Sequence, residues 1–410
     1  MQIKPKIETF ARIKVLGIGG SGTNAVHRMT ELGIRGVEFV AVNTDAQALH
    51  NSHADKKVHI GKTVTRGLGA GMNPDQGRQA AEESRDDIQD VVENADMIFI
   101  TCGLGGGTGT GAAPIIAELA KNLGILTVAV VTKPFTFEGT KRKEIAEEGY
   151  SQLKDKVDAI ISISNDRILQ IIDKKTSLID AFRTVDDVLR QGIQGISDLI
   201  TTHGIVNADF ADVRTIMQDA GTALMGIGSA AGENRAAEAA RNAINSPLLE
   251  LAIDGAKGVL FNITGGRDLG MFEIDEAAKI ITKSVDPEAK IKFGAVIDDT
   301  LKDEVKITVI ATGFDEMQRK PSSIRISETE DFGGISHGFK KMDDIKREEP
   351  AVKKEEPRRI FEEPKQTYQE KPQQAEEPKE SRRPLFGSTP PVEDTGDELD
   401  IPAFIRKKMK

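Results

Sequence analysis

The sequence predicts an α/β fold with a parallel sheet, then a central helix, a smaller α+β domain and a disordered C-terminal tail. Three observations lead to this expectation. Short apolar runs alternate with helical patterns in the first part of the chain, a long apolar stripe at helical spacing follows, and the end of the chain is rich in Pro, Glu, Lys and Gln. Strands that are apolar throughout are typical of a parallel sheet covered on both faces.

The first domain is expected over residues 12–177, after a flexible N-terminus at residues 1–11. Its predicted strands and helices alternate, as in a series of βαβ units. The strands are predicted at residues 13–16, 37–42, 97–102, 126–131 and 159–164, and helices at residues 25–32, 114–123 and 143–154.

A central helix is predicted over residues 178–202. Apolar residues follow one another there at steps of three or four, which places them on one face of a helix. They are Leu178, Phe182, Val185, Leu189, Ile193, Ile196 and Ile200. We expect this helix to lie between two domains.

A second domain of α+β type is expected over residues 203–314. Helices are predicted at residues 235–244 and 273–284, and strands at residues 258–263, 291–297 and 305–311. This part of the chain has no second phosphate-binding loop of its own.

The tail divides into a linker and a terminal peptide. In residues 315–396 the motif Glu-Glu-Pro recurs at 348–350, 355–357, 362–364 and 376–378. Such a composition buries too little apolar surface to offset the entropy of ordering, so we expect disorder. Residues 397–410 combine apolar side chains with a basic end, which is typical of a docking peptide and equally compatible with an unstructured terminus.

Composition narrows the class of protein. A length of 410 residues suggests two domains with additions. The single cysteine, Cys102, has no internal disulfide partner, and neither a signal peptide nor a membrane-spanning run is visible, which points to the cytosol. A net charge of −10 argues against a protein that binds nucleic acid through its phosphates.

The first glycine-rich loop lies at residues 17–24, Gly-Ile-Gly-Gly-Ser-Gly-Thr-Asn, between a predicted strand and a predicted helix. It fits G-x-G-x-x-G, in which glycines allow main-chain N–H groups and a helix N-terminus to meet phosphate. Asp45 follows the next strand, near the position of a ribose-binding acid. This loop alone is therefore also compatible with a dehydrogenase, or with a tight strand–helix turn.

The second glycine-rich loop favours a ligand with several phosphates. Residues 103–111, Gly-Leu-Gly-Gly-Gly-Thr-Gly-Thr-Gly, again lie between a strand and a helix and can form a nest of N–H donors. A nicotinamide dinucleotide requires only one such loop. Because neither loop has the Gly-Lys-Ser/Thr of a Walker A motif, main-chain dipoles and a bound Mg²⁺ are expected to balance the triphosphate charge.

Residues 105–111 match the signature G-G-G-T-G-[ST]-G, and over residues 12–314 the chain resembles the FtsZ family of tubulin-like GTPases of bacterial cell division. Residues 397–406 resemble the terminal peptide of that family. The resemblance implies a GTPase that polymerises head to tail into filaments of the division ring. It also implies a cytoplasmic location at mid-cell and membrane-linked adaptor proteins bound through the terminal peptide, without a membrane span.

The resemblance also implies a set of GTP-binding residues. They are Gly20, Ser21, Gly22, Thr23, Asn24, Ala70, Gly71, Gly106, Gly107, Thr108, Gly109, Glu138, Arg142, Asn165, Phe182 and Asp186. Within this set, Glu138 and Arg142 would contact ribose, and Asn165 and Asp186 would recognise guanine. From the pattern alone, Glu138 and Arg142 are equally an i,i+4 ion pair, and Phe182 is equally a core residue.

Asp209 and Asp212 are the catalytic candidates. Their spacing before a helix predicted at residues 213–218 favours simple capping. In the family, the matching loop reaches the nucleotide of the next subunit, and its acids position water and cation for in-line phosphoryl transfer. Two alternatives remain from the sequence: an NAD-dependent Rossmann oxidoreductase, and a tubulin-like scaffold that does not hydrolyse GTP.

Overall fold

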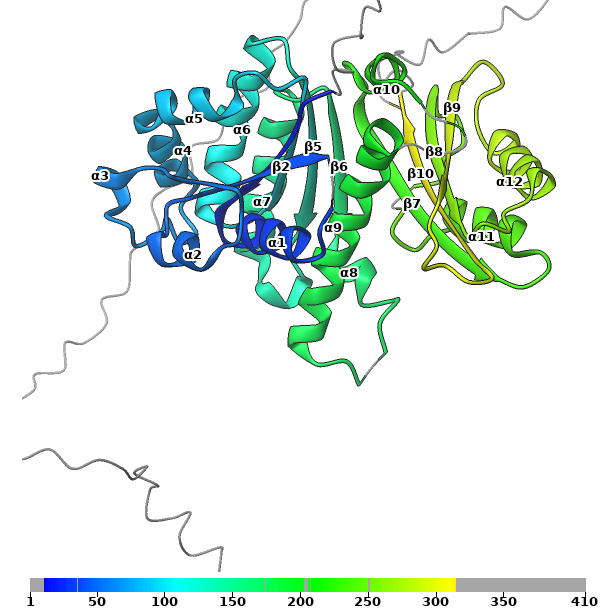
Figure 1. Ribbon diagram of the computed structural model, residues 1–410. Coiled ribbons are helices and arrows are strands. Elements are labelled where there is room, and N and C mark those ends of the chain that lie inside the picture. The colour runs from blue at the N-terminus through cyan, green and yellow to red at the C-terminus, as the bar shows by residue number, and fades with distance from the viewer. Residues whose placement is uncertain are drawn as a thin grey trace, which may run out of the picture. The chain divides into compact units, whose positions relative to one another are not determined.

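The computed structural model describes residues 11–314, except for residues 35, 174, 203–205, 207 and 250. The predicted N-terminal extension up to residue 10, the linker and the terminal peptide lie outside the described residues. Within them the chain forms one ten-stranded sheet with the order β3-β2-β1-β4-β5-β6-β7-β10-β8-β9 (Figure 1). The predicted α/β class is confirmed.

The N-terminal part of the sheet is parallel throughout. Its strands are β1 (Ile13–Ile18), β2 (Val37–Asn43), β3 (Lys56–His59), β4 (Met97–Gly103), β5 (Leu126–Lys133) and β6 (Ala159–Ser164). Strand β1 pairs with β2 on one side and β4 on the other, so Ile13 lies opposite both Val37 and Met97. Strand β3 was not predicted, because its two exposed lysines hide the apolar pattern at the edge of the sheet.

Helices cover both faces of this parallel sheet. They are α1 (Gly19–Glu31), α2 (Ala46–Asn51), α3 (Lys62–Thr65), α4 (Pro74–Glu83), α5 (Arg85–Val92), α6 (Gly107–Asn122), α7 (Thr140–Lys154) and α8 (Asn165–Ile168), with a short 3₁₀ turn, η1 (Thr136–Glu138). One core contains residues of α1 and of the helix predicted at residues 178–202. The other contains residues of α4, α5, α6 and α7. Helices α1 and α6 begin earlier than predicted, inside the glycine loops.

Helix α9 (Leu178–Thr201), predicted as the central helix, lies between the N-terminal and C-terminal parts of the one continuous sheet (Figure 1). Ser177 caps it by accepting a hydrogen bond from the N–H of Asp180 at 3.1 Å. Val185, Leu189 and Ile193 of the predicted stripe are buried. Leu178 and Phe182 at its start are exposed, so the first turns of α9 leave the core.

The C-terminal part continues the same sheet. Its elements are α10 (Phe210–Met217), β7 (Gly221–Ala231), α11 (Arg235–Ile244), β8 (Gly258–Gly265), α12 (Met271–Lys283), β9 (Lys290–Ile297) and β10 (Glu304–Thr312). Strand β10 runs antiparallel to β7 and β8, while β9 is parallel to β8. A third core lies beneath α11 and α12. Strand β7 joins the halves by pairing with β6 at Ala159, Ile160 and Ile161.

Two expectations from composition can be compared with the described residues. None of the helices in residues 11–314 has the length and apolar character needed to cross a membrane. Cys102 is buried in β4, and burial raises the pKa of its thiol to about 12. Its thiol is therefore kept in the protonated form, which is a poor nucleophile.

Candidate functional site

The two glycine loops lie beside each other at the carboxyl ends of two neighbouring strands of the parallel sheet. Strands β1 and β4 are neighbours, and α1 and α6 begin directly after them. At Gly19, φ is +71°, and a Cβ there would lie 2.8 Å from the main-chain N of Gly109. Glycine is required at this contact because any side chain would separate the loops. Two helix N-termini therefore converge on one place, which is suited to a polyanion.

The glycines of this region fall into two groups. A Cβ on Gly22, Gly107 or Gly111 would lie within 2.6 Å of a main-chain oxygen, so these glycines allow close packing of the backbone. A Cβ on Gly20 or Gly106 would have no protein atom within 4 Å. The first group packs the loops together, and the second group leaves space in which a ligand can lie.

Residues 69–73 form a third loop that lies against the start of α6. The N–H of Gly107 donates to the carbonyl of Gly71 at 2.6 Å, so that N–H is already used within the protein. Gly71 itself has φ +55° and no protein atom near a Cβ position. The hydroxyls of Thr108 and Thr44 lie 2.6 Å apart, and Thr23 accepts a hydrogen bond from the Asn43 amide. The side chains of Thr23 and Thr108 thus serve the fold. Thr108 is the second residue of α6, so its N–H has no partner within the helix and can meet a ligand, whereas Thr23 is the fifth residue of α1, where the N–H bonds within the helix.

A cavity of about 360 Å³ opens beside the first loop. The predicted nucleotide residues that line it are Ser21, Asn24, Glu138, Arg142, Asn165, Phe182 and Asp186. Its lining also includes residues that the sequence did not indicate, among them Arg28, Thr132, Pro134 and Ile179. The other predicted residues, Gly20, Gly22, Thr23, Ala70, Gly71, Gly106, Gly107, Thr108 and Gly109, lie in the three loops and are not part of that lining.

Two polar atoms in the cavity lining are buried without a partner in the described structure. They are Nε of Arg142 and Oδ1 of Asn165. Buried polar atoms in proteins nearly always have a hydrogen-bond partner, so each orphan requires an explanation. The two atoms are an unpartnered donor and an unpartnered acceptor on side chains that line one cavity, which is typical of a site for a polar ligand.

Glu138 and Arg142 form the predicted i,i+4 pair, and they also line the cavity. Arg142 Nη1 lies 3.1 Å from Glu138 Oε2, while Glu138 Oε1 accepts the N–H of Phe135 at 2.9 Å. The two interpretations of this pair, surface ion pair and ligand contact, are therefore compatible. The pair orients Arg142 and leaves its Nε free.

Phe182 is not a core residue. It is 41% exposed, and its ring meets Phe135 edge-on with centroids 5.5 Å apart. Phe135 is buried and supports the exposed ring from behind. An aromatic face held open at a cavity wall can stack on a flat ligand.

Asp186 projects from α9 into the cavity and meets Arg28 of α1. Arg28 Nε lies 2.9 Å from Asp186 Oδ2, with side-chain exposures of 34% and 12%. Burial raises the pKa of Asp186 to about 6, and the Arg28 charge opposes that rise. This arginine was missed because on the sequence it is an ordinary polar residue of a surface helix.

Asp209 and Asp212 lie at the start of α10 and do not line the cavity. Asp209 Oδ1 accepts the N–H of Asp212 at 2.8 Å and so caps α10, which begins at Phe210 rather than at the predicted residue 213. Asp212 Oδ1 lies 2.8 Å from Nζ of Lys292 on β9. The side chain of Asp212 therefore has a partner from another element, whereas that of Asp209 has a local structural role.

Asp45 also has a capping role. Its carboxylate accepts the N–H groups of Gln47 and Ala48 at the start of α2, at 2.8 and 3.1 Å. In a Rossmann enzyme an acid at this position would bind ribose. The carboxylate on which the dehydrogenase alternative relies is thus engaged by main-chain donors.

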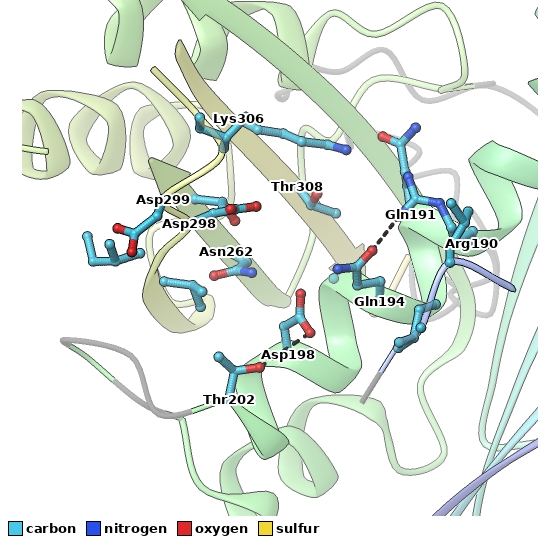
Figure 2. Close-up of a pocket in the computed structure, with 18 of the residues that line it drawn as sticks. Arg190, Gln191, Gln194, Asp198, Thr202, Asn262, Asp298, Asp299, Lys306 and Thr308 are labelled. Atoms are coloured by element: carbon cyan, nitrogen blue, oxygen red, sulfur yellow. Dashed lines mark hydrogen bonds between the residues drawn. The ribbon is translucent and has the colours of Figure 1, made fainter. Parts of the chain in front are cut away.

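A second, larger cavity of about 770 Å³ lies between α9 and the C-terminal strands. Figure 2 shows Asp198 of α9 near Asn262 of β8, while the side chain of Lys306 on β10 extends across the cavity toward Arg190 and Gln191 of α9. Burial raises the pKa of Asp198 and lowers that of Lys306, because each charge is desolvated there. No residue of the two glycine loops lines this cavity, so the smaller cavity is the better candidate for a phosphate-bearing ligand.

One group of side chains in the described structure has spacing suited to a metal ion: His27, Glu31 and His53. His27 Nε2 and His53 Nδ1 lie 3.4 and 3.7 Å from Glu31 Oε1. However, the N–H of His53 donates to His27 Nδ1 at 3.1 Å. A neutral ring that accepts at Nδ1 carries its proton on Nε2, the atom that a metal would need. We therefore assign the group to hydrogen bonding between α1 and the segment after α2.

The chain is similar to known proteins over most of its described residues. Residues 12–173 match the GTPase domain of the Tubulin/FtsZ family, and residues 221–315 match the C-terminal domain of the FtsZ family. An empty FtsZ dimer from M. jannaschii is 46% identical, with a TM-score of 0.73, over 75% of this chain and 90% of that one. CetZ2 from Haloferax volcanii, in a GTPγS-bound protofilament, is 19% identical with a TM-score of 0.64, over 73% of this chain and 92% of that one. At that identity it bears on the fold alone.

Proposed function

Because the chain belongs to the Tubulin/FtsZ family of GTP-binding filament proteins, we propose that it forms division-ring filaments whose hydrolysis of GTP is completed by the adjacent subunit. The observation that supports GTP as the ligand is the convergence of two glycine-rich helix N-termini beside a cavity with an exposed aromatic ring and unpartnered polar atoms. The phosphate chain of a nucleoside triphosphate suits the two helix N-termini, and its base suits the cavity with the exposed ring.

The phosphates would lie at the N-termini of α1 and α6, where Gly20 and Gly106 leave open space. Ser21, Gly22, Thr23 and Asn24 would contribute from α1, and Thr108 and Gly109 from α6. Ala70 and Gly71, in the loop that lies against the start of α6, would contact the outermost phosphate. Gly107 would act through the packing of its loop, because its N–H is donated to Gly71.

The nucleoside would lie in the cavity. Phe182 would stack on the base, Asn165 and Asp186 would bind its edge, and Glu138 with Arg142 would contact the ribose. A carboxylate accepts from both the N1–H and the 2-amino group of guanine, whereas adenine offers no such pair of donors. This chemistry favours GTP over ATP.

The length of α9 supports a catalytic site shared between subunits. The helix has 24 residues, and at about 1.5 Å per residue it spans roughly 36 Å. The nucleotide cavity lies near its first turns and the loop that carries Asp209 and Asp212 lies beyond its last turn. In one subunit these acids would be far from the cavity, so a head-to-tail neighbour would supply them. Head-to-tail contacts of this heterologous kind generate filaments.

The site suits a Mg²⁺ ion held mainly by the phosphates. Both carboxylates that line the cavity, Glu138 and Asp186, already pair with arginines. Magnesium commonly binds substrate phosphates and water with few protein ligands, and when bound it neutralises charge on the phosphoryl group. The chain's own contribution would be to orient the phosphates and, from the next subunit, the attacking water.

Residues 397–410 would bind membrane-linked adaptor proteins at the mid-cell division site in the cytoplasm, with residues 315–396 as the tether. This part of the proposal rests on the sequence of the terminal peptide and its likeness to the family's.

The NAD-dependent oxidoreductase has less support, because Asp45 caps a helix and the second glycine loop would have no role. Nucleotide extracted from the purified protein separates the two: guanine nucleotide is expected, and NAD alone would favour the oxidoreductase. A scaffold that binds GTP without hydrolysing it would assemble but release no phosphate.

The deciding experiment follows light scattering and phosphate release together in GTP or GDP while the protein concentration is varied. We expect scattering with GTP only, and a rate of hydrolysis per subunit that rises at the assembly threshold. A rate per subunit that stays flat across that threshold would contradict a shared site.

A further inference from the structure

Arg28 links the two ends of the candidate nucleotide site. It lies on α1, the helix whose N-terminus carries Ser21 and Asn24, and its side chain lines the cavity. From there it crosses to α9, where its Nε lies 2.9 Å from Asp186 Oδ2. The same helix that would bind phosphate thus also contacts the carboxylate that would bind the base.

The charge state of Asp186 matters because of the chemistry of guanine. The guanine edge presents two donors, so the carboxylate must accept both hydrogen bonds and must be ionised to do so. A protonated Asp186 would present an O–H donor in one of those positions. Charge-assisted hydrogen bonds are also roughly twice as strong as neutral ones.

Burial destabilises the ionised form of Asp186, whereas Arg28 stabilises it. Desolvation raises the pKa of Asp186 to about 6, and the nearby guanidinium lowers it. The other charged side chains that line the cavity, Glu138 and Arg142, pair with each other. Arg28 is therefore the cation, among the described residues of this cavity, that faces Asp186.

We propose that Arg28 is a positioning residue that holds Asp186 ionised and oriented toward guanine, and so determines how selectively and down to what pH the protein binds guanine nucleotides. This inference rests on the proposed function, in which Asp186 contacts the base. A carboxylate has about four acceptor positions, and Arg28 Nε occupies one of them on Oδ2. Oδ1 and the remaining position on Oδ2 are left for the two guanine donors, so Arg28 can stay in place when nucleotide binds.

The expected dependence on pH follows from the ionised form being the binding form. Affinity is present above the pKa of Asp186 and is lost as the pH falls through about 6. Removal of the arginine charge raises that pKa further, so the loss begins at a higher pH. A rise of about one pKa unit weakens binding about tenfold at any pH below both values.

The test is calorimetric titration of nucleotide-free, full-length protein with GDP from about pH 5.5 to about pH 8, which avoids hydrolysis. Arg28→Met is expected to lose affinity at a higher pH than the unmodified chain. It should also lose much of the preference for GDP over IDP, which lacks the 2-amino group. Arg28→Lys should restore the original pH midpoint, and Arg85→Met, which removes an exposed arginine on α5, should leave it unchanged. The titration of the nucleotide's own phosphate is common to all variants and cancels in the comparison.

Two further variants keep the test decisive. If Arg28→Met fails to fold, Arg28→Gln also removes the charge but keeps a side chain that can donate a hydrogen bond. In an Asp186→Asn background, Arg28→Met should have little further effect on affinity. An Arg28→Met protein with the original pH midpoint and the original GDP preference would overturn the inference while leaving the proposed function intact. Failure of the unmodified chain to bind any guanine nucleotide would instead overturn the proposed function.

Discussion

The two acids of the loop before α10 differ in what their carboxylates already bind. Asp209 accepts the N–H of Asp212 and stabilises the helix start, while Asp212 pairs with Lys292 on β9. Replacing Asp209 would therefore remove a helix cap, at a cost of about 1 kcal/mol in stability, as well as any catalytic contribution. Asp212 is the cleaner residue with which to test catalysis.

Asp212→Ala is expected to abolish phosphate release while GTP binding stays close to that of the unmodified protein, because Asp212 does not line the nucleotide cavity. Phosphate release and equilibrium binding of GTP measured on the same preparation check this. A large loss of GTP affinity would show that Asp212 acts within its own subunit.

Lys292 is expected to assist assembly through its charge. Its ammonium pairs with Asp212, and this pairing raises the pKa of Lys292, so it stays protonated at neutral pH. Without it, two uncompensated acids would approach the triphosphate of the next subunit. Lys292→Met should raise the assembly threshold by only about two- to fivefold, because a single exposed ion pair contributes little.

The matched control is Lys290→Met, because Lys290 is another exposed lysine on the same strand. Light scattering at increasing protein concentration gives the assembly threshold of each variant. Added salt should reduce the difference between the two thresholds, because it screens exposed charges. Equal thresholds for Lys290→Met and Lys292→Met would assign no role to the pair with Asp212.

At the scale of elements, glycine serves two purposes that the sequence does not distinguish. A Cβ on Gly111 of α6 would lie 2.0 Å from the carbonyl oxygen of Pro74 in α4. Gly106, at the N-cap of α6, has extended backbone and open space around its Cβ position. The same glycine run therefore packs α6 against α4 at one end and offers room for a ligand at the other.

Gly111→Ala and Gly106→Ala should consequently have opposite effects. Gly111→Ala is expected to lower the free energy of unfolding by about 1–3 kcal/mol, because main-chain atoms must move apart. Gly106→Ala should unfold at the original urea concentration and bind GTP more weakly. Urea unfolding and GTP titration of both proteins give the result, and identical behaviour would refute the division into packing and ligand-facing glycines.

At the scale of the whole molecule, the sheet and its three cores are complete within the described residues. Strand β10 is paired on both sides, and Phe314 packs against the third core. The residues that would bind and hydrolyse GTP all precede that point. The described part of the chain therefore contains what the proposed filament requires.

A chain that ends after Phe314 should accordingly assemble with GTP and release phosphate as the full chain does, and should lose adaptor binding. Sedimentation with GTP and a pull-down with a membrane-linked division adaptor measure the two properties. Failure of the shortened chain to assemble would mean that residues 315–410 are more than a tether and a docking peptide.

Much of the fold followed from local patterns. Residues 159–164 and 235–244 were predicted with the bounds that β6 and α11 have. Strand β7 was missed because Gly226 and Gly228, which suggest a loop, are needed where β7 lies against the main chain of α11. The close packing that requires these two glycines cannot be recognised without knowing that α11 lies against β7.

Local sequence patterns were sufficient to predict the α/β class, the central helix and the two glycine-rich loops, because hydrophobic periodicity and glycine content act within a few residues of the chain. Which glycines face a helix and which face open space depends on the packing of elements in the folded chain. That packing also brings Arg28 to Asp186 and Lys292 to Asp212. Those pairings depend on how α1 packs against α9 and how β9 approaches α10, and distances between elements remote in sequence are not encoded in any local pattern.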